Sequence, residues 1–261
     1  MSLEKDSLLK IQARVIGALL MREILIRYGR HNIGFLWIIV EPMLFTLGVT
    51  TLWTLTRLTH GSSLPITAFA LTGYSSVLVW RNTVTRCTMA VRSNRSLLHH
   101  RYIKVLHLFL ARITLEISSV TMSFLILSIA FISMGLMDFP DNILTILFGW
   151  LLLMWFAVAL ALMIGAISEH FETVERLWHT VAYLLFPMSG AAFMVDWLPQ
   201  KAQEIVLWLP MIHGVELVRE GFFGTTVHTH YSIQYLSSFC LVLSLLSLAM
   251  VKDASRRIGS E

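Results

Sequence analysis

The stretch that decides the fold is residues 143–166, ILTILFGWLLLMWFAVALALMIGA, which contains no Asp, Glu, Lys, Arg or His. About 20 predominantly apolar residues are enough to cross the hydrocarbon core of a bilayer as one helix. The polar turn 138–142, DFPDN, separates this stretch from another long apolar stretch, residues 105–136. We therefore expect the two stretches to form a hairpin of transmembrane helices.

Four more apolar stretches extend the pattern in both directions, at residues 33–55, 64–86, 179–198 and 232–251. Of the 261 residues, 56% are hydrophobic and 14% are charged, and the mean hydropathy is +0.71. A soluble domain carries roughly 25% charged residues, so a soluble fold is excluded. The sequence predicts an all-α polytopic membrane protein with six transmembrane helices in a single domain over residues 1–261.

The distribution of basic residues predicts the orientation of the six spans. With both termini on one side, 17 of the 20 Lys and Arg fall on that side, and only Arg57, Lys201 and Arg219 fall on the other. Cytoplasmic loops carry the basic excess in membrane proteins. We expect both termini to be cytoplasmic, and the net charge of +4 to reflect this asymmetry and not nucleic-acid binding.

Two segments do not fit a simple span. Residues 8–30 place Leu8, Ile11, Val15 and Leu19 on one helical face, which predicts an amphipathic helix in the cytoplasmic interface. Residues 198–231 contain two Leu-Pro steps, each followed by a run too short to span. We expect a re-entrant helix pair here on the extracytoplasmic side, before the last span.

Two cytoplasmic loops carry opposite charge. The loop at 92–104 is basic, whereas the loop at 167–178 contains Glu169, Glu172 and Glu175. Opposite charges on the two loops would suit docking onto one partner, although solvated loops of this kind are equally common.

No common nucleotide-hydrolysing or hydrolase motif is present. G-x-x-x-x-G-K-[ST], G-x-S-x-G, H-E-x-x-H and C-x-x-C are all absent. Cys87 and Cys240 lie in apolar stretches and are expected to be core residues, and His228 and His230 are more simply a surface loop than a metal site. The chain is therefore expected to have no catalytic residues, no metal site and no bound cofactor.

A few polar side chains fall inside the apolar stretches. Glu41 lies about a third of the way into the first span, where a charge costs roughly 2.5–3.5 kcal/mol near the bilayer centre. Its carboxylate should face protein or water, with a functional role and a packing role equally plausible. Arg112 and Glu116 are spaced to satisfy each other along one helix. Trp155, near the middle of its span, packs between helices or stacks on a sugar.

Two motifs carry a resemblance to a known family. The segment at 27–37, RYGRHNIGFLW, with Glu41 and Pro42, resembles the signature that precedes the first span of ABC-2 type exporter permeases. It is most similar to the capsular-polysaccharide branch of that family. The run 209–224, LPMIHGVELVREGFFG, is similar to the proline-to-glycine segment before the last span. The resemblance covers nearly the whole chain and implies the ABC-2 (type V) permease fold.

The resemblance also implies partners. Two copies would form a channel, and each would dock a separate ATPase subunit that binds ATP and Mg²⁺. The cargo would be a lipid-linked polyanionic capsular polysaccharide, passed to a periplasmic adaptor and an outer-membrane exporter. The resemblance assigns ATPase docking to the interfacial helix at 8–30 and to residues of the two cytoplasmic loops. These residues are Arg92, Ser93, Asn94, Arg95, Leu98, Glu169 and Glu172.

Other residues are assigned by their chemistry. Arginines at the inner mouth would attract anionic groups, and aromatic rings would stack on sugars. The expected substrate pathway comprises Arg22, Arg27, Tyr28, Arg30, Trp37, Glu41 and Trp155. The expected periplasmic gate comprises His213, Glu216, Arg219, Phe222 and Phe223.

Three other functions remain open on the sequence. An O-antigen or teichoic-acid exporter permease would share the fold, and an ABC-2 drug or small-lipid exporter would have a more apolar pathway. A polytopic membrane transferase would need an intramembrane catalytic cluster, for which Glu169 and His170 are the nearest candidates.

Overall fold

The computed structural model describes residues 8–28, 32–56, 64–99 and 103–258. Those parts of the chain are helical, joined by turns and short irregular segments. The α-helices in chain order are α1 (Leu8–Tyr28), α2 (Asn32–Thr56), α3 (Ile66–Cys87), α4 (Val105–Ser133), α5 (Ile143–His170), α6 (Glu172–Met188), α7 (Gln200–Val206), α8 (Pro210–Phe223) and α9 (Ile233–Ile258). Three 3-10 helices lie between them, η1 (Arg92–His99), η2 (Val195–Trp197) and η3 (Gly224–Thr226).

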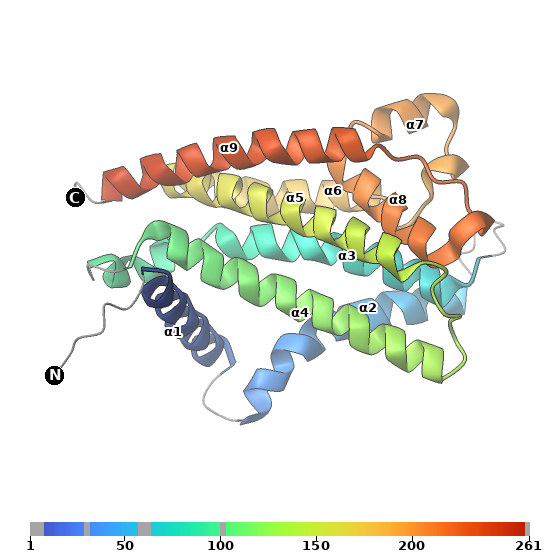
Figure 1. Ribbon diagram of the computed structural model, residues 1–261, viewed down its shortest axis with the longest axis horizontal. Coiled ribbons are helices and arrows are strands. Elements are labelled where there is room, and N and C mark those ends of the chain that lie inside the picture. The colour runs from blue at the N-terminus through green and yellow to red at the C-terminus, as the bar shows by residue number, and fades with distance from the viewer. Residues whose placement is uncertain (1–7, 29–31, 57–63, 100–102, 259–261) are drawn as a thin grey trace.

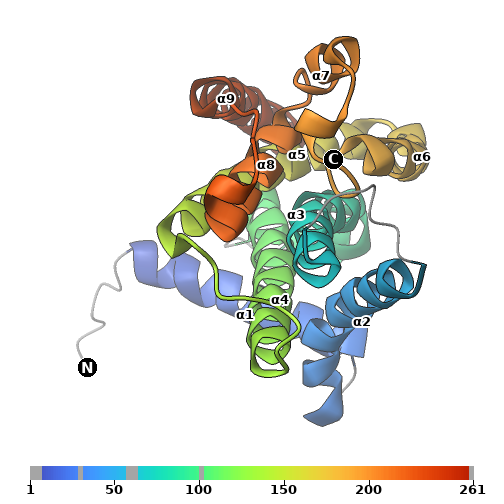
Figure 2. The same ribbon diagram turned by 90° about the vertical axis from the view of Figure 1, so that its right-hand side faces the viewer.

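The long helices run roughly side by side along one axis (Figure 1). The start of α1 and the end of α9 lie at the same end of this bundle, together with η1, whereas α7 and α8 lie toward the opposite end. In the end-on view α3 lies inside the bundle, with α2 and α6 on the same side (Figure 2). Helix α3 packs against α2, α4, α5, α6 and α8, and most of its side chains are buried.

Within the described residues, four helical stretches are long and apolar enough to cross a membrane. They are Leu36–Leu55, Val105–Ser133, Ile143–His170 and Ile233–Arg257. Helix α3 is more polar and buried in protein, and α6 has 17 residues, a length of about 26 Å. The all-α membrane architecture is thus confirmed.

The expected hairpin of α4 and α5 is formed by local signals in the turn. Gly135, with φ of 69°, ends α4 in the left-handed conformation that glycine adopts at little cost. Asn142 caps α5 by accepting hydrogen bonds from the backbone N–H groups of Leu144 and Thr145, at 3.0 and 3.2 Å. The first helix of the pair stops at Ser133, three residues earlier than expected.

Two expectations about the middle of the chain are wrong. The 167–178 segment is not a loop, because α5 continues to His170 and α6 starts at Glu172, with Phe171 alone between them. In place of the span expected at 179–198, helix α6 begins seven residues earlier and ends at Met188, after which Gly190 turns the chain with φ of 80°. Pro187 lies in the last turn of α6, where it has no backbone N–H to donate and so favours the end of the helix.

Helix α1 packs along α4 through the apolar face that its sequence predicts. Leu19 is buried with Leu108 and Ala111, and Val15 packs against the same group. The expectation that 198–231 forms a helix, a break and a second helix is also confirmed, by α7 and α8. Helix α8 ends at Phe223, followed by Gly224 with φ of 57°.

Candidate functional site

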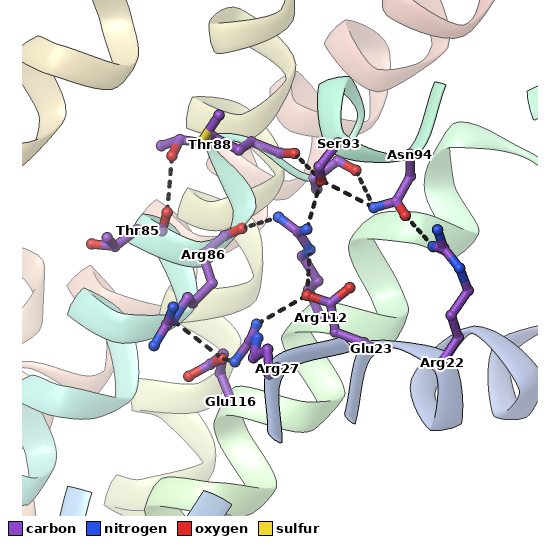
Figure 3. A network of polar contacts seen from close by, with 12 residues as sticks. Arg22, Glu23, Arg27, Thr85, Arg86, Thr88, Ser93, Asn94, Arg112 and Glu116 are labelled. Carbon is purple, nitrogen blue, oxygen red and sulfur yellow. Dashed lines mark hydrogen bonds and ion pairs between the residues drawn. The ribbon is translucent and has the colours of Figure 1, made fainter. Parts of the chain in front are cut away.

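Six charged residues form a cluster where α1, α2, α3 and α4 meet, near the end of the bundle at which α9 ends. Figure 3 shows the part of the cluster that belongs to α1, α3 and α4. We call it the ion cluster. Its members are Glu23 and Arg27 of α1, Glu41 of α2, Arg86 of α3, and Arg112 and Glu116 of α4. Three arginines meet three carboxylates, so the cluster is formally neutral.

The α1 side of the ion cluster connects this helix to α4. Arg27 donates to Glu116 and also lies 3.3 Å from Glu23. Glu23 in turn lies 3.1 Å from Arg112. The pairing of Arg112 with Glu116 expected from their spacing is therefore wrong, because both face α1 and each finds its partner on that helix.

The α3 side of the ion cluster continues toward η1. Arg86 binds Glu41 at 3.1 Å and lies 3.7 Å from Glu116. Arg112 donates to the backbone carbonyl of Arg86 at 2.8 Å and to the Ser93 hydroxyl at 2.7 Å. A continuous set of charged hydrogen bonds therefore joins η1 to α4, α3 and α2.

The residues expected to dock an ATPase lie on and beside η1. Arg95 binds Glu169 at 2.8 Å, and Arg92 binds Glu172 at 3.2 Å. Opposite charges on the two segments thus pair within the chain. Asn94 is buried and accepts a hydrogen bond from Arg22 of α1.

Arg22 and Arg27 therefore do not form the cationic entrance to the substrate pathway that the sequence predicts. Arg22 contacts η1, and Arg27 is enclosed by two carboxylates. Arg30 and the side chain of Tyr28 lie outside the described residues. Leu98 is half-buried against the core beside α1 and α4.

A polar cavity of about 270 Å³ lies between α2, α3 and α6. It shares Glu41 and Arg86 with the ion cluster, so the two features are continuous. The cavity is lined by Glu41, Phe45, Tyr74, Leu78, Arg81, Asn82, Thr85, Arg86, His179, Ala182 and Tyr183. This lining combines two guanidinium groups, a carboxylate, an amide, an imidazole and two phenols in an otherwise apolar bundle.

Arg81 forms the centre of an aromatic group in this cavity. Its guanidinium carbon lies 4.6 Å from the ring centroid of Tyr183 and 6.0 Å from that of Phe186. Tyr74 meets Phe186 edge to face at a centroid distance of 5.7 Å. Aromatic faces beside hydrogen-bonding groups suit a ligand with both apolar faces and hydroxyls, such as a sugar.

The two tryptophans predicted to stack on sugars are not in the cavity lining. Trp37 is half exposed on α2. Trp155 lies on α5 and donates from its indole N–H to the hydroxyl of Ser244 in α9, at 3.0 Å. Of the predicted pathway residues whose side chains the structure describes, only Glu41 lines the cavity.

The expected gate residues are packed inside the protein. Arg219 is fully buried, donates to the carbonyl oxygens of Phe193 and Ala191, and lies 3.9 Å from the ring centroid of Phe69. Glu216, also fully buried, accepts from the backbone N–H groups of Val195 and His230. These bonds hold the irregular segment after α6 against α8 and α3.

The remaining gate candidates have structural partners too. Phe222 and Phe223 meet edge to face at 5.2 Å and are buried. His213 accepts from the backbone N–H of Ser232 on Nδ1, so its proton is on Nε2, which donates to the carbonyl of Leu207 at 2.9 Å. None of these side chains lines the polar cavity.

Sequence reasoning missed the polar cavity residues of α3 and α6. The signal was their spacing: Tyr74, Leu78, Arg81 and Thr85 lie on one helical face at intervals of three or four residues. Within the described residues, no group of three or more His, Cys, Asp or Glu side chains could hold a metal ion.

Comparison with known proteins gives concordant matches. Residues 14–223 match the ABC-2 type transporter family. The chain is 44% identical to the capsule polysaccharide export inner-membrane protein CtrC of Neisseria meningitidis, over 96% of this chain and 94% of that protein. It is 43% identical to the capsule polysaccharide export inner-membrane protein BexB of Haemophilus influenzae, with the same coverage. It is 26% identical to the polysialic acid transport protein KpsM of Escherichia coli, over 93% and 94%. The chain therefore belongs to the ABC-2 type transporter family.

Proposed function

We propose that this chain is the permease subunit of an ATP-driven exporter that moves lipid-linked capsular polysaccharide across the bacterial inner membrane. The observation that carries the proposal is the polar cavity between α2, α3 and α6. It gives a membrane bundle a place for a hydroxyl-rich, charged polymer. Relatives named for capsule polysaccharide export, matched over nearly their whole length, support the same cargo.

The proposed membrane topology has six spans, formed by α2, α3, α4, α5, α6 and α9. An even number of spans places both termini on one side, in agreement with the start of α1 and the end of α9, which lie at the same end of the bundle in Figure 1. The excess of basic residues makes that side cytoplasmic. Helices α7 and α8, with 7 and 14 residues, are too short to span and would then form a re-entrant pair on the periplasmic side.

Two copies are proposed to face each other through the side of the bundle that carries the polar cavity. Helices α2 and α6 expose large apolar side chains there, among them Phe45 and Leu184. A second copy would cover this surface and close the two cavities into one channel. A polymer longer than the bilayer is thick needs such a continuous path.

A separate ATPase subunit is proposed to dock on η1 of each copy. Because Arg92 and Arg95 already pair with glutamates of α5 and α6, the docking surface is a preassembled unit of three helices rather than two loose loops. ATP and Mg²⁺ would be bound by that ATPase. A periplasmic adaptor and an outer-membrane exporter would receive the polysaccharide.

The test is to isolate the tagged chain from its native host in mild detergent and to identify by mass spectrometry what accompanies it. Recovery of an ATP-binding-cassette ATPase in equal amount is expected. Deletion of the gene should leave polysaccharide inside the cell and remove it from the surface. Isolation of the chain alone, with normal surface polysaccharide after deletion, would refute the proposal.

A further inference from the structure

We infer that the polar cavity is a binding subsite for one anionic sugar unit, with the oxyanion held by Arg81 and the sugar ring held against Tyr183. This inference rests on the proposed export function and goes further, because it assigns a contact residue and a ligand chemistry to the cavity. The ligand class is a glycan that carries carboxylates or phosphodiesters.

The first argument is the distribution of charge. Arg86, the other guanidinium of the cavity, is bound to Glu41 at 3.1 Å. Arg27 and Arg112 are likewise bound to carboxylates of the ion cluster. By contrast, among the residues that the structure describes, no carboxylate oxygen lies within 4 Å of Arg81. The cavity therefore contains one cation whose charge no carboxylate neutralises.

The second argument is the geometry of that cation. A guanidinium above the Tyr183 ring, at 4.6 Å, interacts with the ring through its face. A guanidinium carries five N–H donors, and a planar oxyanion accepts two of them at once. The ring contact thus holds the charge of Arg81 at the cavity, where such an oxyanion could bind it.

The third argument is the rest of the lining. The amide of Asn82, the phenol of Tyr74 and the imidazole of His179 supply both donors and acceptors, as sugar hydroxyls require. The volume of about 270 Å³ lies just below the usual range for small-molecule sites, about 300–1,000 Å³. It suits a single unit of a polymer that passes through in steps, not a whole lipid anchor.

Binding can be measured on the purified complex of permease and ATPase in detergent, by the change in its intrinsic fluorescence. The probes are a galacturonic acid hexamer and the same hexamer as its neutral methyl ester. The Arg81→Gln variant should bind the acidic hexamer at least tenfold more weakly, as expected for loss of a charged hydrogen bond. Arg81→Lys should recover part of this loss, and Arg256→Gln, at an exposed site on α9, should bind like the wild type.

Three outcomes would overturn the inference. Equal binding of the acid and the ester would show that the oxyanion is not recognised, and unchanged binding by Arg81→Gln would place the contact elsewhere. A third arm uses vesicles containing phosphatidylglycerol. If these compete with the hexamer at Arg81 and the ester binds as well as the acid, the site belongs to a lipid headgroup.

A parallel measurement separates this inference from the proposed function. Surface polysaccharide is assayed in cells that carry the wild type, Arg81→Gln or Arg256→Gln, alongside recovery of the ATPase. If the wild type exports and Arg81→Gln exports equally well, the subsite is wrong and the export function stands. If the wild type supports no export, the proposed function itself fails.

Discussion

Replacing Glu116 by Gln is expected to destabilise the bundle, because this carboxylate of α4 pairs with an arginine of α1 and with an arginine of α3. Its side chain is 7% exposed, and it pairs with Arg27 and, at 3.7 Å, with Arg86. The substitution keeps the shape of the side chain and removes one negative charge. The ion cluster then carries a net positive charge, on the side where Arg27 and Glu23 are only 14% and 10% exposed.

The magnitude follows from the partners that remain. Removing one member of a buried ion pair costs about 3–5 kcal/mol when the other is left without compensation. Here Arg27 keeps Glu23 at 3.3 Å and Arg86 keeps Glu41 at 3.1 Å, so we expect about half of that, roughly 2 kcal/mol. For a chain of this size that corresponds to a fall in Tm of about 4–8 °C.

Thermal unfolding of the purified protein in one detergent measures the effect. Glu204→Gln, on an exposed face of α7, is the matched control and should leave Tm unchanged. The double variant Glu116→Gln with Arg27→Gln removes the surplus charge and should recover much of the loss. A Tm within about 1 °C of the wild type for the single variant, or simple addition of losses in the double variant, would refute the role given to the cluster.

Three further predictions concern packing, docking and the substrate path. Gly73→Ala should lower stability by about 1–3 kcal/mol, because the added Cβ would overlap a backbone carbonyl oxygen, while Gly48→Ala meets nothing within 4 Å and should be neutral or stabilising in thermal unfolding. Glu169→Arg should reduce recovery of the ATPase in co-purification, because Glu169 contacts Arg92 and Arg95 and the new arginine would repel both. The double variant Glu169→Arg with Arg95→Glu should restore recovery, and its failure to do so would show that this ion pair does not contribute to docking. Trp155→Phe should leave surface polysaccharide at the wild-type level, and a clear loss would return this ring to the substrate path.

The strongly apolar helices could be predicted from the sequence because crossing a membrane requires only a long enough run of apolar residues, which can be read directly along the chain. The stretch at 143–166 needs only its own composition to be read as a helix, and the turn before it carries its own glycine and asparagine signals. The helix expected at 179–198 was misplaced for the same reason. The sequence remains apolar after Met188, but Pro187 and Gly190 end the helix there. The segment that follows is held by a hydrogen bond from the buried Arg219 to a backbone carbonyl.

Charged residues were harder to assign because their role depends on which helix lies opposite. Arg27 looked like part of a cationic mouth, and its partner Glu116 is 89 residues away in sequence. Arg81 was not predicted to be a site residue, although it lies on a face of α3 whose residues recur with helical spacing. Its importance arises only when α6 places Tyr183 above it and leaves no carboxylate within 4 Å in the described chain.

The ion cluster and the polar cavity share Arg86, and this sharing constrains how an ATPase can act on the cavity. Arg112 holds Ser93 of η1 and the backbone of Arg86 at once, at 2.7 and 2.8 Å. Hydrogen bonds to charged groups are worth about 1.5–3 kcal/mol each. A displacement of η1 therefore has to break such bonds or carry α3 with it. Moving α3 keeps them, and it also moves Arg81 and the wall of the cavity relative to α2 and α6. A force applied at η1 is thus directed to the place where we expect the sugar to bind.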